Sequence, residues 1–445
     1  MNKKGLTRRE FLKLSTMAGA GTLLAACAPT SFNVNEEVVT NTPEATEANK
    51  TLIRVWGGNK DITDTKPFFD RYTATHENVM FELLNQADYN AARLVLQSGS
   101  VDILLNNPGW AETDPLIRAG LLKDMDGYWD KYNWDDRFTD FGKANVSLNG
   151  KVYGTPNEQA FIACMYNAET FRKHGLTGKE DPQTYDEFIK ILQVLKDGGE
   201  APIISGLRGD SQTDMIFAPF VQAAVGRKGM EKLLFGDGKW TDPAIVEATN
   251  RMIALAKDGF IDMSGLALDY TEAIGRFLEG KNPIWTGGVW ANAAISDAFG
   301  GSDNYGFFTI PPWDNSIPIG YPGGIGSLYS IAASSAVADT AADVLDSFFD
   351  EEALRIWVED LKIFPPVKAD FSKYALTPQQ IKQTQVAQMP DGIGYWLVVY
   401  LPPDLLDLFK SGGAGLINGQ ITAEDWLAEM QAGWEKGLKE GTIPR

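Results

Sequence analysis

Amide and aromatic side chains follow two predicted strands of this chain. Asn107 and Trp110 come after a strand predicted for residues 101–105, and Asn59 and Lys60 follow one predicted for residues 51–56. Amide groups hydrogen-bond hydroxyls, and an aromatic face packs against the apolar face of a ring. These residue types suit a neutral sugar. The alternative for Asn59 is that it only shapes the turn after its strand.

The chain offers little for catalysis. It has no Gly-x-Ser-x-Gly segment, and its only histidines, His76 and His174, lie in polar contexts. This excludes multi-histidine metal sites and disfavours a Ser-His-Asp triad, so we expect no catalytic residue, metal or cofactor. Glu158 is the carboxylate best placed for a ligand. It suits a glycosidase pair, but accepting hydrogen bonds from hydroxyls or pairing with a cation explains it equally well.

The elements that would position these residues begin with a βαβ pattern. Strands are predicted for residues 51–56 and 79–84, with a helix at 67–75 between them and another at 88–96. In an open α/β sheet the ligand crevice lies beyond the carboxyl ends of the strands. That position predicts Asn59 and Lys60 as ligand contacts.

A second group of elements starts in the segment 149–167. Asn149-Gly150 predicts a tight hairpin, and residues 157–159 predict a polar bend between two strands. The apolar run 160–166 has strand length and is typical of a strand buried in a mostly parallel sheet. Cys164 in this run is expected to be a small buried hydrophobe. The pattern suggests a chain that leaves one core and enters another.

This segment resembles the crossover of the extracellular solute-binding proteins of bacterial ABC importers, family 1, which include maltose-binding proteins. The similar residues are Asn-Gly-Lys-x-Tyr-Gly-x-Pro (149–156), Tyr166-Asn167, and Pro-x-Thr-Tyr-x-Glu-Phe (182–188). A second similar stretch spans 277–290. It carries Phe277, Gly280, Lys281, Ile284, Gly288 and Trp290, with Pro283 in place of the family's usual alanine.

The resemblance implies an α/β, two-lobed periplasmic-binding-protein-like fold (type II) with the ligand cleft between the lobes. It implies lobe 1 at 51–157 and 303–368, and lobe 2 at 158–302 and 369–445. It also implies that Trp290 stacks on the ligand, with packing between helices as the alternative. Further ligand-facing positions implied by it are Gly323 and Gly324 in a glycine-rich turn at 319–327, Tyr321 beside them, and Trp396, which precedes a helix predicted to run through residue 401.

The first fifty residues predict export and anchoring. Residues 7–13, Thr-Arg-Arg-Glu-Phe-Leu-Lys, match a twin-arginine signal, and residues 1–26 read as a signal peptide. Leu-Ala-Ala-Cys at 24–27 resembles a lipobox, which predicts lipidation of Cys27 and a cell-envelope protein held on the outer face of a membrane. The alternative is an ordinary signal peptide with an incidental cysteine. Residues 27–50 are polar and read as a disordered tether.

The formal charge of −19 disfavours nucleic acid and anionic lipid as partners. Taken with the resemblance, these features predict a monomeric lipoprotein that captures a mono- or oligosaccharide and delivers it to ABC permease subunits with a cytoplasmic ATPase. Three alternatives stay open: a secreted carbohydrate-active enzyme, a ligand-sensing lipoprotein that signals to a sensor kinase, and a binder of polyamine-type cations.

Overall fold

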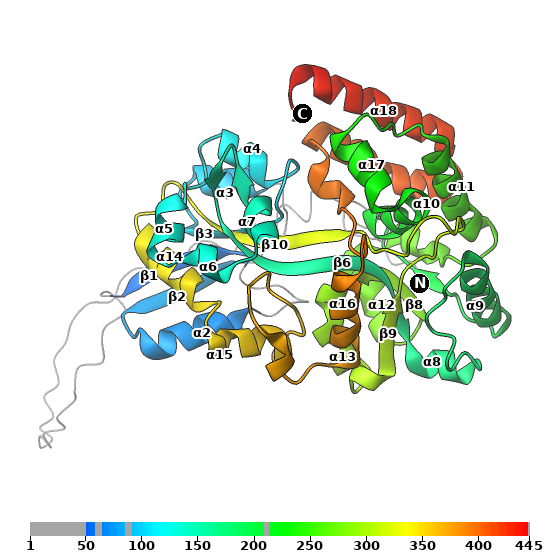
Figure 1. Cartoon of the computed structure of the whole chain (residues 1–445), viewed down its shortest axis with the longest axis horizontal. Helices are drawn as coiled ribbons and strands as arrows, with labels where there is room; N and C mark the ends of the chain where they lie inside the picture. The colour runs from blue at the N-terminus through cyan, green and yellow to red at the C-terminus, as the bar shows by residue number, and fades with distance from the viewer. Residues whose placement is uncertain (1–49, 58–64, 85–90, 209–212, 444–445) are drawn as a thin grey trace, which may run out of the picture. The chain divides into compact units, whose positions relative to one another are not determined.

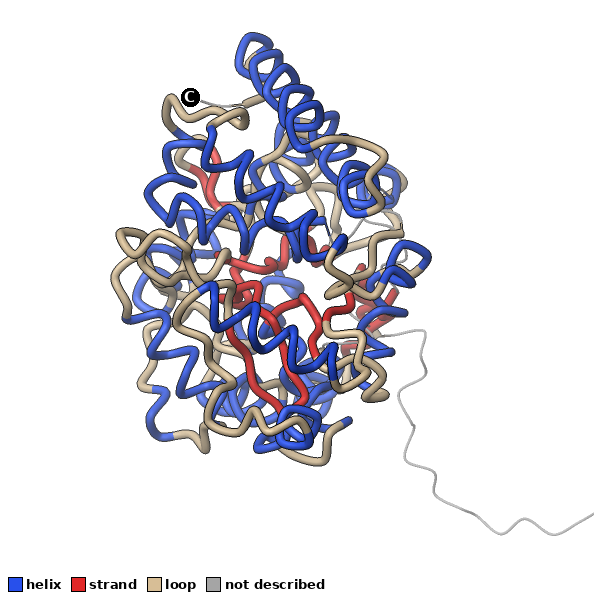
Figure 2. Tube along the Cα trace, turned by 90° about the vertical axis from the view of Figure 1, so that its right-hand side faces the viewer, coloured by secondary structure: helices blue, strands red, loops and turns tan. Residues whose placement is uncertain are grey.

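The computed structural model of the protein describes residues 50–57, 65–84, 91–208 and 213–443. In this part, eight strands form one mixed sheet in the order β2-β1-β3-β10-β6-β8-β7, and β9 pairs with β6 off this path. Helices surround the strands (Figure 1, Figure 2). None of the helices in these ranges is long and apolar enough to cross a membrane.

One half of the sheet has the predicted βαβ opening. β1 (Thr51–Trp56) pairs in parallel with β2 (Val79–Leu84) and with β3 (Ile103–Asn106), and α2 (Lys66–Thr75) lies between β1 and β2 in the chain. Both strand predictions at the start of the chain are confirmed. The residues at the start of the helix predicted for 88–96 lie partly outside the described ranges, and α3 covers Ala92–Gln97.

The predicted hairpin at Asn149-Gly150 is confirmed. It joins β4 (Ser147–Leu148) to β5 (Lys151–Val152), an antiparallel pair. Both turn residues have positive φ, 52° at Asn149 and 77° at Gly150, the conformation that an Asn-Gly turn favours.

The predicted polar bend at 157–159 is wrong. β6 runs without a break from Thr155 to Asn167, and its first half pairs antiparallel with β10 (Gly323–Ile331). Its second half pairs antiparallel with β8 (Ile284–Gly288) and β9 (Tyr305–Phe308), so the expected parallel surroundings are also wrong. The run is buried as expected, because alternate side chains pack into two core clusters on opposite faces of the strand. Figure 1 shows β6 and β10 side by side, passing from the elements around β3 to those around β8.

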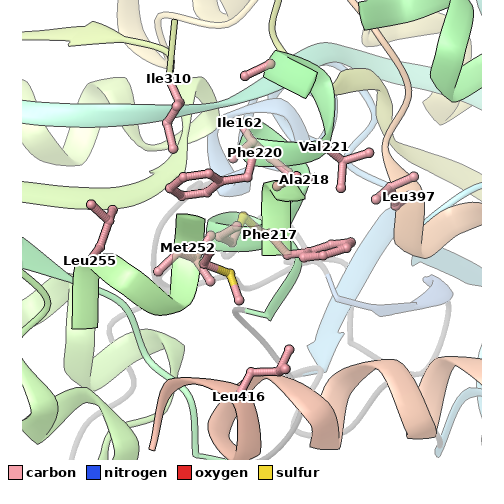
Figure 3. Close-up of a cluster of buried hydrophobic side chains, with 14 of the residues drawn as sticks. Ile162, Phe217, Ala218, Phe220, Val221, Met252, Leu255, Ile310, Leu397 and Leu416 are labelled. Carbon is pink, nitrogen blue, oxygen red and sulfur yellow. The ribbon is translucent and has the colours of Figure 1, made fainter. Parts of the chain in front are cut away.

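The core of the described residues divides into three large clusters. The first packs β1, β3 and the end of β10 against α2 and α14 (Ala338–Ser347), with Phe68, Tyr329 and Trp357 among its members. The second packs α9 (Tyr185–Asp197), α10 (Thr213–Phe235), α11 (Pro243–Lys257), α17 (Pro403–Ile417) and α18 (Ala423–Glu440) together, and Figure 3 shows part of it. The third surrounds β8 and β9 and includes Phe161, Trp285 and Tyr321.

Helix α9 illustrates how the sequence produces these clusters. Thr184 caps the helix by accepting a hydrogen bond from the backbone N–H of Glu187. Phe188, Ile191, Leu192 and Leu195 recur at helical spacing and are all buried on one face. Cys164 is also buried, with 1% of its surface exposed, in agreement with its predicted role as a small hydrophobe.

The remaining described elements are shorter. They are α4 (Thr113–Arg118), α5 (Asp126–Lys131), α6 (Trp134–Arg137), α7 (Asp140–Asn145), α8 (Ala168–Lys173), β7 (Ile203–Ile204), α12 (Tyr270–Leu278), α13 (Asn292–Ala298), α15 (Glu351–Arg355) and α16 (Pro378–Gln388). Single turns of other helix types are η3 (Met263–Ala267), η4 (Val289–Ala291), η5 (Ser302–Asn304), η6 (Ile356–Asp360), η7 (Phe371–Lys373) and η8 (Leu397–Tyr400).

Two further local predictions need correction. The glycine-rich stretch predicted as a turn at 319–327 is strand β10 from Gly323 onward, because its backbone pairs with β6. The helix predicted to run through residue 401 is only the 3-10 turn η8.

The cluster membership also bears on the lobe boundaries. The boundary predicted at 302/303 assigns β9 and Tyr321 to lobe 1. Both nevertheless pack in the third cluster, most of whose residues belong to the predicted lobe 2. The boundaries stay a prediction, and these contacts favour moving the second crossing into β10.

Candidate functional site

A cavity lies where β6 and β10 pair beside the first cluster. Its volume is about 10 Å³, which is room for roughly one water molecule. Its lining residues are Thr65, Leu105, Asn157, Glu158, Ser327, Tyr329 and Trp357. Glu158 is the only carboxylate among them. The cavity therefore combines apolar walls with one acidic group and the neutral hydroxyl or amide groups of Thr65, Asn157, Ser327 and Tyr329.

A local irregularity of the strand pair shapes this cavity. The register between β6 and β10 shifts on either side of Ser327. A Cβ at Gly326 would lie 2.9 Å from both Cγ and Oε1 of Glu158, so the carboxylate can lie over this backbone only because residue 326 is glycine. Ser327 donates a hydrogen bond from Oγ to Oε1 of Glu158 over 3.2 Å. Bulges of this kind redirect side chains at functional sites.

Asn157 adds a buried acceptor to the same wall. Its side chain is 2% exposed, and its Oδ1 has no hydrogen-bond partner in the described part of the chain. Buried amide oxygens are normally hydrogen-bonded, so an orphaned one next to a cavity is a candidate ligand contact.

Trp290 lies at the end of β8, where η4 begins. It is partly buried and packs against all three large clusters. Its indole N–H donates to the Tyr270 hydroxyl over 2.7 Å, and its ring stacks on Trp396 with centroids 5.4 Å apart and planes 12° apart. A Cβ at Gly288 would overlap the benzo ring of Trp290, so glycine at 288 is required for this ring position. The two tryptophans that were predicted separately are thus brought together, with Trp396 9% exposed behind Trp290.

Asp214, which sequence reasoning missed, lies beside this tryptophan pair. It is 2% exposed in the first turn of α10, and burial raises its pKa to about 7 against the opposing effects of the Trp396 indole and Lys410. The indole N–H of Trp396 lies next to the carboxylate without a well-aligned hydrogen bond, and neither carboxylate oxygen has a partner among the described residues. The signal in the sequence was a single acid directly before the apolar run 215–221.

Asn107 and Trp110, in the loop after β3, make contacts of their own and do not touch Trp290 or Trp396 in the contacts described. Asn107 donates from its amide to Oε1 of Glu112 over 2.9 Å. The backbone N–H of Trp110 donates to the carbonyl of Val399 over 2.7 Å, and the Trp110 ring packs against Phe235, Tyr400 and Trp434. The loop after β3 is therefore held against the second cluster.

The other predicted positions are placed as follows. Tyr321 is 3% exposed and packs on Phe161 and Phe307 in the third cluster. Gly323 and Gly324 pair with Phe161 and Ala160 in the β10–β6 ladder. Asn59, Lys60 and Cys27 lie outside the described residues.

The two histidines have structural roles. Nε2 of His174 contacts Oε1 of Glu200 at 2.8 Å, and the ring of His76 stacks on Tyr72 at a centroid distance of 4.0 Å. No group of three or more potential metal-ligating side chains occurs within the described ranges.

Residues 57–355, more than half of the chain, match the family model of the bacterial extracellular solute-binding protein. The chain belongs to this family. Among curated relatives, this solute-binding protein is 27% identical over 157 residues to an uncharacterized ABC transporter extracellular-binding protein of Pyrococcus horikoshii, covering 34% of this chain and 36% of that one. It is 27% identical over 153 residues to a multiple sugar-binding protein of Streptococcus mutans, covering 33% and 36%. The matched part thus spans about a third of the length of these relatives.

Solved structures resemble the solute-binding protein over most of its length. A chitin oligosaccharide binding protein superposes with a TM-score of 0.76 at 22% identity, covering 87% of this chain and 99% of that one. A maltose-bound protein of T. maritima superposes with a TM-score of 0.71 at 15% identity, covering 86% and 98%. At such identities the likeness shows the fold alone, and the predicted two-lobed α/β binding-protein fold is confirmed.

Proposed function

We propose that this solute-binding protein captures a neutral mono- or oligosaccharide between its lobes and delivers it to the permease of an ABC importer. The observation that carries this proposal is the placement of Trp290, which touches all three core clusters and is held in plane by Tyr270 and Trp396. A rigid aromatic ring at such a junction is suited to stacking on a sugar ring.

The polar groups near this junction fit the same ligand class. Asn157 and Glu158 on β6 offer oxygen acceptors at the cavity, and hydroxyl groups are the donors that a sugar provides. Two relatives support the same ligand class, since one is a multiple sugar-binding protein of Streptococcus mutans and another a lactose-binding protein of Rhizobium radiobacter. The further proposed ligand contacts are Asn59, Lys60, Asn107, Trp110, Tyr321, Gly323 and Gly324.

Capture would use the two lobes. β6 and β10 run between the two groups of elements as a pair, so bending of these two strands would open and close the cleft (Figure 1). A ligand favours the closed state by its differential affinity for it, and a few kcal/mol suffice. The closed form would then be recognised by the permease, and lipidation of Cys27 would hold the monomeric protein on the outer face of the membrane.

A carbohydrate-active enzyme is the main alternative. Glycoside hydrolysis requires two carboxyl groups flanking the scissile bond. The cavity wall at Glu158 contributes one. The fit to a binding protein is therefore better than the fit to a hydrolase.

The test is thermal unfolding of the soluble protein that starts near residue 51, with chitin, xylan, maltose and lactose oligosaccharides and a set of polyamines. A ligand at 100 times its Kd stabilises by about 2.7 kcal/mol, which shifts the midpoint measurably. A shift with one sugar class and no product on chromatography is the expected result. A shift with polyamines alone, or release of shorter sugars, would overturn the proposal. A sensing partner in place of a permease would be revealed by which membrane protein copurifies with the ligand-loaded form.

A further inference from the structure

We propose that Asp214 is a ligand-contacting residue whose carboxylate accepts hydrogen bonds from hydroxyl groups of the bound sugar. This inference rests on the proposed function and assigns to it a specificity-determining group on α10. It follows from three observations: the burial of the carboxylate, the lack of well-aligned hydrogen bonds to its oxygens among the described residues, and its contact with the indole of Trp396.

The carboxylate is buried without the contacts that a structural acid needs. Its side chain is 2% exposed, and both oxygens lack a hydrogen-bond partner among the described residues. The adjacent hydroxyl of Thr213 does not serve it, because that group donates to the carbonyl of Lys410 over 2.9 Å. A buried charge without partners is strongly destabilising, so folding alone gives no reason for an acid at this position.

The position of Asp214 beside Trp396 suggests a functional reason for an acid at this place in the chain. Trp396 touches Asp214 on one side and stacks on Trp290 on the other. Trp396 therefore links the carboxylate to the ring on which the ligand is proposed to stack. A sugar stacked on an aromatic ring presents hydroxyl donors at its rim, and an ionised carboxylate is the strongest acceptor that a protein offers to them.

No charged neighbour among the described residues pairs with Asp214 closely enough to bring its pKa back to the usual acidic range. Lys410 on α17 is the charged group that acts on the carboxylate, and it is not within ion-pair distance in the described contacts. The segment before η8 contributes only the neutral indole of Trp396. Burial therefore dominates, and the pKa of about 7 places both protonation states within the range of an ordinary binding assay.

The experiment compares wild type, Asp214→Asn and Asp407→Asn in binding titrations from pH 5 to pH 8. The probe is the neutral oligosaccharide that stabilises the wild type most, drawn from the chitin, xylan, maltose and lactose series, because its own charge does not change with pH. Asp407 is an exposed carboxylate on α17 and serves as the matched control. A hydrogen bond to a charged group is worth about a tenfold change in Kd or more.

We expect Asp214→Asn to weaken binding about 10- to 100-fold at pH 8. Wild-type affinity should fall about tenfold for each pH unit below the pKa, whereas Asp214→Asn should show a flat profile. Asp407→Asn should match the wild type at each pH. The melting temperature of Asp214→Asn without sugar should equal or exceed that of the wild type at pH 8, since a buried charge is removed. A merely structural acid would instead lower it.

The results separate this inference from the proposed function. If the wild type binds a sugar with a flat pH profile, or if Asp214→Asn binds within twofold of it, the assignment of Asp214 is wrong while the sugar-binding function stands. The wild-type profile gives this answer even if the variant does not fold. If no sugar binds the wild type, the proposed function fails and the inference fails with it.

Discussion

Replacing Trp110 by alanine tests whether the loop after β3 is docked on the second core cluster in solution. Its ring lies 5.5 Å from Tyr400, 6.0 Å from Phe235 and 6.4 Å from Trp434, measured between ring centroids. Truncating a fully buried tryptophan to alanine costs about 3–5 kcal/mol. Trp110 is only partly buried, so we expect the free energy of unfolding to fall by about 2 kcal/mol.

The measurement is urea unfolding at 25 °C followed by circular dichroism, with the slope m compared between variants. Leu94→Ala is the control, because Leu94 is 68% exposed and its truncation should change stability by less than about 0.5 kcal/mol. A loss below about 0.5 kcal/mol for Trp110→Ala would mean that the ring is not docked, and the reasoning from these contacts would be refuted.

A second variant of the same loop makes the test sharper. Gly109 has φ of 91°, and a Cβ there would overlap the carbonyl oxygen of Val399, which accepts the hydrogen bond from Trp110. Gly109→Ala should therefore disturb the same contact through the backbone. If one contact is involved, the double variant should lose less than the two single losses added together, and strict additivity would speak against a shared contact.

Three further predictions follow from the candidate site and from the first fifty residues. Trp290→Ala should weaken sugar binding by about 2 kcal/mol in calorimetric titration, and Gly288→Ala should weaken it too by displacing the ring; unchanged affinity in either variant would remove Trp290 from the site. Cys27→Ser should release the protein from the membrane fraction on cell fractionation, and a variant that stays membrane-bound would contradict the lipid anchor. Because the pKa of Asp214 is raised to about 7 in the folded state, its protonation stabilises the fold fully below about pH 4, and this stabilisation is lost as the pH rises through 7. The raised pKa corresponds to a loss of about 4 kcal/mol in the free energy of unfolding when Asp214 ionises. Urea midpoints of the wild type should therefore fall between pH 5 and pH 8 more than those of Asp214→Asn, and equal falls would contradict the raised pKa of Asp214.

Local pattern was sufficient to predict many of the elements. β1 and β2 occur at the predicted residues because both are short apolar runs of strand length. The Asn-Gly hairpin occurs because few other sequences tolerate its positive φ values. In both cases the signal lies within a few neighbouring residues. The ligand role of Trp290 was instead implied by the resemblance of residues 277–290 to the solute-binding family.

The site itself required contacts that no local pattern contains. Trp290 and Trp396 are 106 positions apart, and only the fold stacks them. Asp214 was missed because an acid at the start of an apolar helix looks like an ordinary first-turn residue, whose stabilising effect at a helix N-terminus is common. Its isolation from partners becomes visible only when the packing of α10 on α17 and on Trp396 is known.

The segment 157–159 shows why polarity misled the prediction of β6. Asn157, Glu158 and Gln159 were expected to bend the chain, since polar residues inside an apolar run usually mark a turn. In the structure they stay in the strand because β10 supplies antiparallel backbone partners along it. Their polarity instead marks the stretch where the sheet lines a cavity, with Glu158 beside Ser327 and Asn157 in the wall. Under the proposed function, a continuous strand with polar residues near its start serves a two-lobed binder, because the same residues carry the sheet between the cores and would face the ligand there.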